Sequence, residues 1–124
     1  MTHATGYAAL SAESPMAPFT FERRALRADD VRLDIRYCGV CHSDLHQARD
    51  DWHNSVYPCV PGHEIIGTVT EVGPDVTRFQ IGDLAAIGCM VDSCMACPEC
   101  VRGQEQYCVK RSTPTYNGKD RMDG

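Results

Sequence analysis

Four of the eight cysteines lie in one short stretch of the sequence with the spacing C-x2-C-x2-C-x7-C. They are Cys94, Cys97, Cys100 and Cys108. A C-x2-C step lets one turn of backbone aim two sulfurs at the same ion, about 2.3 Å away, whereas neighbouring cysteines can hardly satisfy disulfide geometry with other loops at once. Four thiolates fill every position of a tetrahedral site and leave none for a substrate. The spacing therefore predicts a structural zinc site that folds the segment around it.

Two alternatives stay open for these cysteines. Tetrathiolate donors also suit iron in a rubredoxin-like site. An even number of cysteines in a small exported domain would indicate disulfides, and a C-x2-C pair can also be redox-active. The sequence starts MTHATGYAALSAESP, which has neither a basic nor an apolar leader segment. We therefore expect a cytoplasmic protein with reduced cysteines and favour zinc.

Size and charge limit the remaining possibilities. The chain has 124 residues, with 12 basic against 17 acidic side chains and a formal net charge of -5. A chain of this length forms one domain at most. Its scattered acidic residues argue against a nucleic-acid partner, which would need a basic surface. Its longest apolar stretches are far shorter than the roughly 20 residues that a membrane span requires.

The hydrophobic pattern predicts a mainly β fold. Residues 31–37 alternate strictly between apolar and polar, which is typical of a half-buried strand. Residues 65–72 are rich in β-branched side chains and are followed by the turn sequence Gly-Pro-Asp. Shorter strands are expected over residues 84–87, 5–10 and 19–23. Together they suggest a small β barrel or sandwich.

One short helix and one irregular segment interrupt this pattern. Ser43 is a good N-cap for a helix that should end near Arg49, because acidic residues after it oppose the helix dipole. Residues 113–124 are polar and show no periodicity. We therefore expect a folded domain over residues 1–112, followed by a poorly ordered tail.

Cys41 and His63 are candidates for a second metal site. Cys41 follows a predicted strand and His63 precedes the next one, so the two loops can meet at one edge of a sheet. Thiolate and imidazole both suit Zn²⁺. Spacing alone leaves another interpretation open, in which Cys38, Cys41 and Cys59 are small packing residues and His63 is an ordinary loop histidine.

The motifs together resemble a known family. They are YCGVCHSDLH at 37–46, YPCVPGHEIIGTVTEVG at 57–73, the Gly-Asp pair at 82–83 and the four-cysteine segment at 94–108. They resemble the zinc-dependent alcohol dehydrogenases of the medium-chain dehydrogenase/reductase superfamily, in particular the branch similar to cinnamyl alcohol dehydrogenase. The resemblance implies a GroES-like partial barrel with short helices and a zinc-binding lobe. It also implies an NADP-linked enzyme that interconverts aldehydes and alcohols.

This resemblance implies roles for the residues around the second metal site. Cys41 and His63 match two ligands of the catalytic zinc. Glu64 matches the acid beside that zinc, and Asp44 matches the carboxylate that orients the ligating histidine, as expected for a metal-bound imidazole.

It implies further roles for residues that would act on substrate or coenzyme. Ser43 matches the hydroxyl that passes a proton to the substrate oxygen, and His46 matches the outer end of that relay. His42 stands where relatives place a side chain near the coenzyme pyrophosphate. Trp52 is a candidate wall of the substrate pocket, although a core aromatic is an equal possibility.

Parts of the family pattern do not occur in these 124 residues. A third catalytic zinc ligand, a cysteine, and the glycine-rich fingerprint of a Rossmann coenzyme domain are both missing. The catalytic zinc site should therefore be incomplete, and the chain alone should be inactive. We expect an N-terminal catalytic-domain portion of a longer enzyme.

Two other hypotheses remain. The chain could be a stand-alone zinc-binding or interaction module that reuses the fold without catalysis. It could also belong to an assembly in which a separate chain supplies the missing half, and open strand edges would allow a homo-oligomer.

Overall fold

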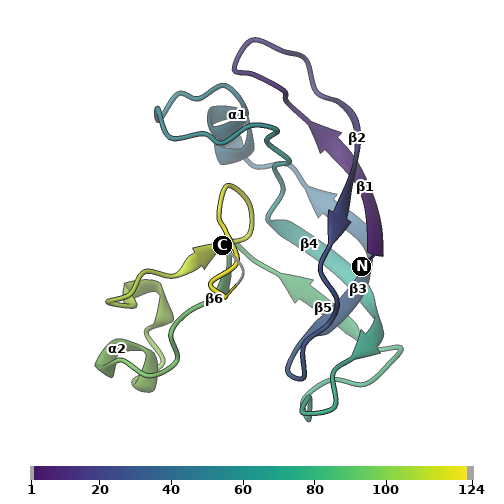
Figure 1. The fold of residues 1–124 in the computed structure, drawn as a ribbon, viewed down its shortest axis with the longest axis vertical. Coiled ribbons are helices and arrows are strands. Elements are labelled where there is room, and N and C mark those ends of the chain that lie inside the picture. The colour runs from purple at the N-terminus through teal and green to yellow at the C-terminus, as the bar shows by residue number, and fades with distance from the viewer. Residues whose placement is uncertain (1, 123–124) are drawn as a thin grey trace.

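Most of the regular structure is antiparallel β-sheet (Figure 1). The computed structural model describes residues 2–122. Strand β1 (Thr2–Ala8) pairs with β2 (Ala17–Arg23), and the three-stranded sheet has the order β3 (Val31–Gly39), β4 (Glu64–Val72) and β5 (Leu84–Ile87). The mainly β prediction is confirmed.

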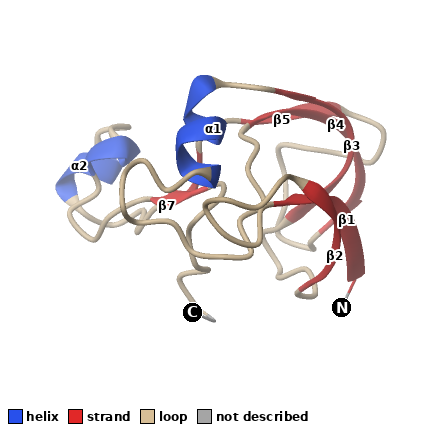
Figure 2. Cartoon of the chain, turned by 90° about the horizontal axis from the view of Figure 1, so that it is seen from above, coloured by secondary structure: helices blue, strands red, loops and turns tan. Residues whose placement is uncertain are grey.

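The four-cysteine segment forms a lobe of its own beside these sheets. It contains β6 (Met90–Asp92), the one-turn helix α2 (Pro98–Val101), the 3-10 helix η1 (Glu105–Tyr107) and β7 (Thr113–Pro114). β6 and β7 pair with each other and with no other strand of the described chain. In the view of Figure 2 the lobe lies on one side and β1 to β5 on the other, with α1 between them.

The predicted strands agree with the structure to different degrees. β5 has the predicted bounds, β4 begins one residue earlier, and β3 continues two residues further, to Gly39. The strands predicted at 5–10 and 19–23 lie at 2–8 and 17–23. These two pair along their full length in a regular register, from Thr2 opposite Arg23 to Ala8 opposite Ala17, so partner contacts and not local pattern set their ends.

The expected half-buried face of residues 31–37 is wrong at its far end. The side chain of Ile35 is 57% exposed and that of Tyr37 73% exposed. The register of β3 against β4 shifts twice, between Arg32 and Leu33 and between Ile35 and Tyr37. Such irregularities change the face on which later residues lie, so strict alternation in sequence does not become strict alternation in burial.

Helix α1 (His42–Ala48) begins two residues earlier than predicted. Cys41, and not Ser43, is the N-cap, because the Asp44 carboxylate accepts the Cys41 backbone N–H at 2.8 Å in a capping box. The predicted end is confirmed, since Arg49 is the C-cap. Within residues 2–122, every helix is too short or too polar to cross a bilayer.

Little hydrocarbon is buried in the described chain. Val69 of β4 is the only large side chain that is less than 2% exposed. The buried cluster in the lobe consists of the cysteines themselves, with Cys97, Cys100 and Cys108 each 7% exposed or less. The lobe therefore has sulfur where a larger domain would have aliphatic side chains, and its stability must come from what those sulfurs bind.

The segment expected to be a disordered tail is placed in the structure through residue 122. Thr113 and Pro114 form β7, and the Asn117 side chain accepts the backbone N–H of Val56 at 2.7 Å. Asp120 forms ion pairs with Arg24 and Arg27 at 2.9 and 2.8 Å. All these partners are distant in sequence, so the local polar composition gave no sign of them. Residues 123 and 124 of the expected tail lie outside the described residues.

Candidate functional site

The sulfurs of Cys94, Cys97, Cys100 and Cys108 all lie within 4.8 Å of one another. Cys100 Sγ is 3.4 Å from Cys97 Sγ and 3.9 Å from Cys94 Sγ. A tetrahedral ion with metal–sulfur bonds of about 2.3 Å separates its ligands by about 3.8 Å, whereas a disulfide needs about 2.05 Å. The four-cysteine cluster is therefore consistent with a structural zinc lobe, and all four cysteines are free thiols.

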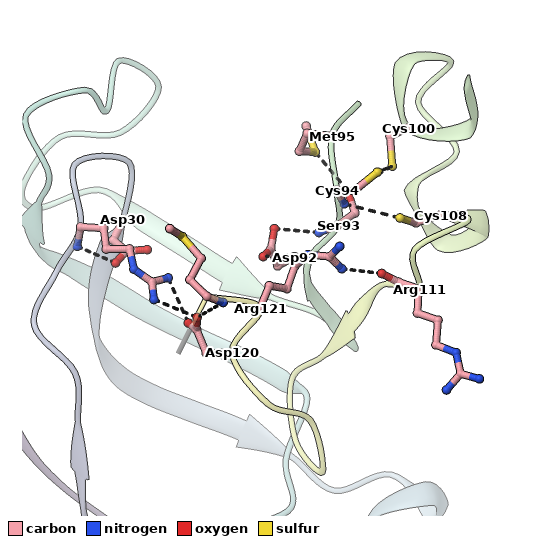
Figure 3. A network of polar contacts seen from close by, with 12 residues as sticks. Asp30, Asp92, Ser93, Cys94, Met95, Cys100, Cys108, Arg111, Asp120 and Arg121 are labelled. Atoms are coloured by element: carbon pink, nitrogen blue, oxygen red, sulfur yellow. Dashed lines mark hydrogen bonds and ion pairs between the residues drawn. The ribbon is translucent and has the colours of Figure 1, made fainter. Parts of the chain in front are cut away.

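Backbone N–H groups point at these sulfurs and favour their thiolate forms. Cys94 Sγ accepts the N–H of Cys97 at 3.3 Å. Cys108 Sγ accepts the N–H of Cys94 at 3.4 Å, as Figure 3 shows. Hydrogen bonds from the N–H groups of Cys100 and Val109 lower the pKa of Cys97 to about 6. Backbone N–H groups also lower the pKa of Cys94. At Cys100 the contact with Ser93 is outweighed by burial and by the Cys97 and Cys108 thiols, which raise the pKa of Cys100 to about 11. The backbone therefore favours negative sulfur at Cys94 and Cys97, which a dication would neutralise.

The second candidate site joins three donors of different types. One ligand atom each of Cys41, His63 and Glu64 lies within 4.8 Å of the others. Cys41 stands between β3 and α1, His63 directly precedes β4, and Glu64 is the first residue of β4, where it pairs with Gly39 across the sheet. A Cβ on Gly39 would clash with the Glu64 carboxylate, so a larger residue there would push this carboxylate from its present place.

Asp44 connects the parts of this second site. The side chain is only 6% exposed. Its Oδ2 accepts the backbone N–H of Cys41 at 2.8 Å, and its Oδ1 accepts that of Gly62 at 2.9 Å and lies 3.2 Å from His63 Nδ1. With Nδ1 bonded to a carboxylate, Nε2 of His63 is the nitrogen left for a metal. Gly62 has a φ of 122°, a conformation that favours glycine.

Ser43 and His46 lie on the same helix as Asp44. The Ser43 hydroxyl donates to Cys41 Sγ at 3.2 Å. His46 Nδ1 lies 2.7 Å from an Asp51 carboxylate oxygen, and its ring stands 5.2 Å from that of His42 and 5.4 Å from that of Trp52. The sequence-predicted residues around Cys41 are therefore gathered along α1 and the loop after it.

Two residues at this site escaped the sequence analysis. Asp51 was considered only as a helix-ending charge, although an acid five residues after His46 can turn back to it. Tyr116 lies in the segment expected to be disordered. Its ring centroid stands 5.4 Å from that of His63. No feature of the sequence near Tyr116 indicates this contact.

The other three cysteines do not all pack inside the protein. Cys59 is buried, 3% exposed, whereas Cys38 and Cys89 are exposed. The packing role left open for Cys38 and Cys59 in the sequence therefore holds for Cys59 and is wrong for Cys38. The candidate ligand group contains none of the three.

A hollow of about 350 Å³ lies elsewhere on the described surface. It contains no candidate zinc ligand, and its lining includes both lysines of the chain and two arginines. The lining residues are Lys110, Arg111, Ser112, Thr113, Pro114, Lys119 and Arg121.

Comparisons with known proteins point to one family. The family described as "Alcohol dehydrogenase GroES-like domain" matches residues 27–122. The chain is 50% identical over 115 residues to probable cinnamyl alcohol dehydrogenase 6 of Arabidopsis thaliana, covering 93% of this chain and 31% of that protein. It is 53% identical over 109 residues to the aldehyde reductase YahK of Escherichia coli, covering 88% and 31%.

Solved structures agree with these relatives. A cinnamyl alcohol dehydrogenase from Sorghum bicolor superposes with a TM-score of 0.94 at 42% identity, over 98% of this chain and 34% of that one. The corresponding enzyme from Helicobacter pylori, in complex with NADP(H), superposes with a TM-score of 0.90 at 44% identity, over 94% and 33%. The chain spans about a third of the length of these proteins.

Proposed function

Because this chain belongs to the alcohol dehydrogenase GroES-like domain family, we propose that it is the N-terminal catalytic-domain portion of a zinc-dependent, NADP-linked alcohol dehydrogenase or aldehyde reductase. The observation that carries the proposal is the arrangement around Asp44. One buried carboxylate contacts the backbone of one candidate ligand, Cys41, and the imidazole of the other, His63. This is the carboxylate–histidine pattern that metal-binding imidazoles use.

The residues present fit a zinc ion at this position. Thiolate, imidazole and carboxylate are all zinc donors, and two or three protein ligands leave a position open for a substrate oxygen. An ion held by these residues would supply Lewis-acid chemistry toward a carbonyl group, and a nicotinamide coenzyme would supply the hydride. Cys41 and His63 would hold the ion, and Glu64 offers an adjacent carboxylate.

The neighbouring side chains would manage the proton of the alcohol. The Ser43 hydroxyl lies beside the Cys41 sulfur at 3.2 Å, where it can bond a substrate oxygen next to the metal. Asp51 accepts the Nδ1–H of His46 and so leaves Nε2 free to exchange a proton at the outer end of the relay. His42, at the start of α1, is the candidate contact for the coenzyme pyrophosphate.

Trp52 is the candidate for recognition of an aromatic aldehyde or alcohol. Its side chain is 49% exposed and its ring stands 5.4 Å from His46. An indole open to solvent beside the relay offers a flat apolar surface for a substrate ring.

Metal counting and cobalt substitution test this function on the 124-residue chain. We expect one tightly held zinc in the four-cysteine lobe and a second, weaker site that takes Co²⁺ and shows a thiolate-to-cobalt absorption band. The Cys41→Ser variant should lose that band, while Cys38→Ser, a matched change at an exposed cysteine, should keep it.

Addition of benzamide, an unreactive analogue of an aromatic aldehyde, should shift the cobalt bands if its oxygen can reach the metal. A chain that holds only the zinc of the lobe and takes no cobalt at Cys41 would behave as a stand-alone zinc module and would contradict the proposal. Two zinc ions that both survive dialysis would show instead that the chain completes the second site by itself.

A further inference from the structure

Residues 113–120 return from the cysteine lobe toward the loop that follows α1 (Figure 1, yellow). Their first two residues form β7, and the Thr115 N–H donates to the Cys89 carbonyl at 3.2 Å. At the other end, Asp120 forms ion pairs with two arginines that follow β2. This returning segment is therefore attached at both ends, and Asn117 lies between the two attachments.

Asn117 binds the loop after α1 through both polar atoms of its side-chain amide. Its Oδ1 accepts the Val56 N–H at 2.7 Å, and its Nδ2 donates to the Asn54 carbonyl at 3.1 Å. One partner is a donor and the other an acceptor, so only one orientation of the amide makes both bonds. The backbone of Asn117 has a φ of 55°, which asparagine adopts more readily than most residues. Asparagine thus supplies both the turn and the clamp.

Helix α1 holds the same loop through Gln47, which is only 5% exposed. Gln47 Nε2 donates to Asn54 Oδ1 at 2.9 Å and to the Ser55 hydroxyl at 2.5 Å. The Ser55 hydroxyl donates in turn to the Gln47 carbonyl at 2.5 Å. Residues 54–56 are therefore bonded to α1 on one hand and, through Asn117, to the returning segment on the other.

Trp52 stands directly before these clamped residues. The His53 N–H donates to the Asp50 carbonyl at 2.9 Å and closes a turn around Trp52, after which the chain continues into Asn54. The indole is 49% exposed, and its ring centroid stands 5.4 Å from that of His46. Because half of the side chain faces solvent, its place depends strongly on how firmly the loop backbone is held.

We propose that Asn117 is a positioning residue for Trp52: its amide holds residues 54–56 and thereby keeps the indole beside His46. The meaning of this for an aromatic substrate rests on the proposed function, whereas the position of the loop is a property of the chain without metal at the second site. Loss of the amide should leave the loop bonded to α1 alone, with the indole more mobile and more open to solvent.

Fluorescence tests the position of the loop on the 124-residue chain with zinc in the lobe. The chain has one tryptophan, so its emission reports on Trp52 alone. Asn117→Gly removes both side-chain bonds and still permits the left-handed backbone. Arg111→Gly is the matched control, because Arg111 is exposed and has a φ of 63°. Acrylamide quenching should rise in Asn117→Gly by up to about twofold, since an indole that is 49% exposed can at most double its exposure, and should stay at the wild-type value in Arg111→Gly.

Amide hydrogen exchange tests the clamp itself. The Val56 N–H should exchange about tenfold faster in Asn117→Gly, because it loses its acceptor. Asn117→Asp keeps an oxygen for the Val56 N–H but has no donor for the Asn54 carbonyl. In that variant the Val56 amide should stay slow while the quenching of Trp52 rises in part. Asn117→Asp therefore remains informative if Asn117→Gly fails to fold.

Binding of two amides to the cobalt-loaded chain tests the consequence for substrates. Benzamide and acetamide offer the same kind of carbonyl oxygen to the metal, but only benzamide has an aromatic ring. Asn117→Gly should weaken benzamide binding about two- to tenfold, the range for one aromatic contact, and leave acetamide binding unchanged. A general loss of structure at the metal would weaken both amides.

The two levels of the hypothesis fail separately. Unchanged quenching of Trp52 in Asn117→Gly would overturn the positioning role, even with faster exchange at Val56, because the clamp would then act only on its own loop. Equal effects on benzamide and acetamide would overturn the link to aromatic recognition. Wild-type chain that takes no Co²⁺ at Cys41 would overturn the proposed function instead, and the quenching result would still decide whether Asn117 positions Trp52.

Discussion

Replacement of Asp44 should weaken both the fold and the second metal site. An asparagine at position 44 has one oxygen where aspartate has two. If that oxygen takes the place of Oδ1, it keeps the bonds to Gly62 and His63, but the NH2 group then faces the N–H of Cys41. If the oxygen takes the place of Oδ2, it keeps the bond to Cys41 and the bonds to Gly62 and His63 are lost. Each hydrogen bond to a charged acceptor contributes about 1.5–3 kcal/mol. We expect Asp44→Asn to lower the free energy of unfolding by about 2–3 kcal/mol, a large part of the stability of a domain of this size.

Urea denaturation and Co²⁺ titration measure the two effects. The free energy of unfolding from the urea curve should fall by about 2–3 kcal/mol, and Co²⁺ affinity at Cys41 and His63 should fall about ten- to a hundredfold. Asp29→Asn makes the same chemical change at an exposed position and should leave both quantities unchanged. An Asp44→Asn chain with wild-type stability and wild-type metal affinity would refute the argument that this carboxylate holds the site together.

Three further outcomes follow from the structure. Complete chelation of zinc should make residues 89–112 sensitive to proteases and remove their amide-exchange protection. The buried cluster of this segment consists of cysteine side chains, which would lose their shared ion. Unchanged proteolysis would contradict this. Asp120→Asn should lower the free energy of unfolding by about 1–2 kcal/mol in urea titrations, since Asp120 pairs with the partly buried Arg24 and Arg27. Asp75→Asn, the same change at an exposed position, should lower it by less than about 0.5 kcal/mol, and equal effects would argue against the ion pairs. Hydrogen bonds from the Arg24 guanidinium lower the pKa of Asp30, so the stability that this ion pair adds is present above about pH 4 and is lost as pH falls through the lowered value. The difference in unfolding free energy between wild type and Asp30→Asn should accordingly shrink below about pH 4, and a constant difference would rule this linkage out.

The zinc lobe and the main strands were predictable because their signals are local. Four cysteines at short spacing imply a shared ion whatever the rest of the chain does, and β4 and β5 carry apolar residues with clear turn signals at their ends. The candidate second site was assembled mainly from the family resemblance. The structure adds the contacts of Asp44 on which that site depends.

What the sequence could not indicate depends on contacts between distant residues. The α1 boundary moved because the Asp44 side chain reaches back to Cys41, which makes a cysteine the N-cap. Exposure at Ile35 and Tyr37 follows from two register shifts that alternation in sequence does not show. Tyr116 lies against His63 only because its neighbours Asn117 and Asp120 are bonded to residues far from them in sequence.

The attachment of residues 113–120 to distant parts of the chain also sets the order in which contacts at the site can form during synthesis. Arg24 and its partner Asp120 are separated by 96 positions. At about 5–20 residues per second, a ribosome takes roughly 5–20 s to make the chain between them. Residues 2–72, which include both candidate ligands, are therefore made before Tyr116, whose ring stands 5.4 Å from that of His63. The contact between Tyr116 and His63 waits for a segment near the end of the described sequence.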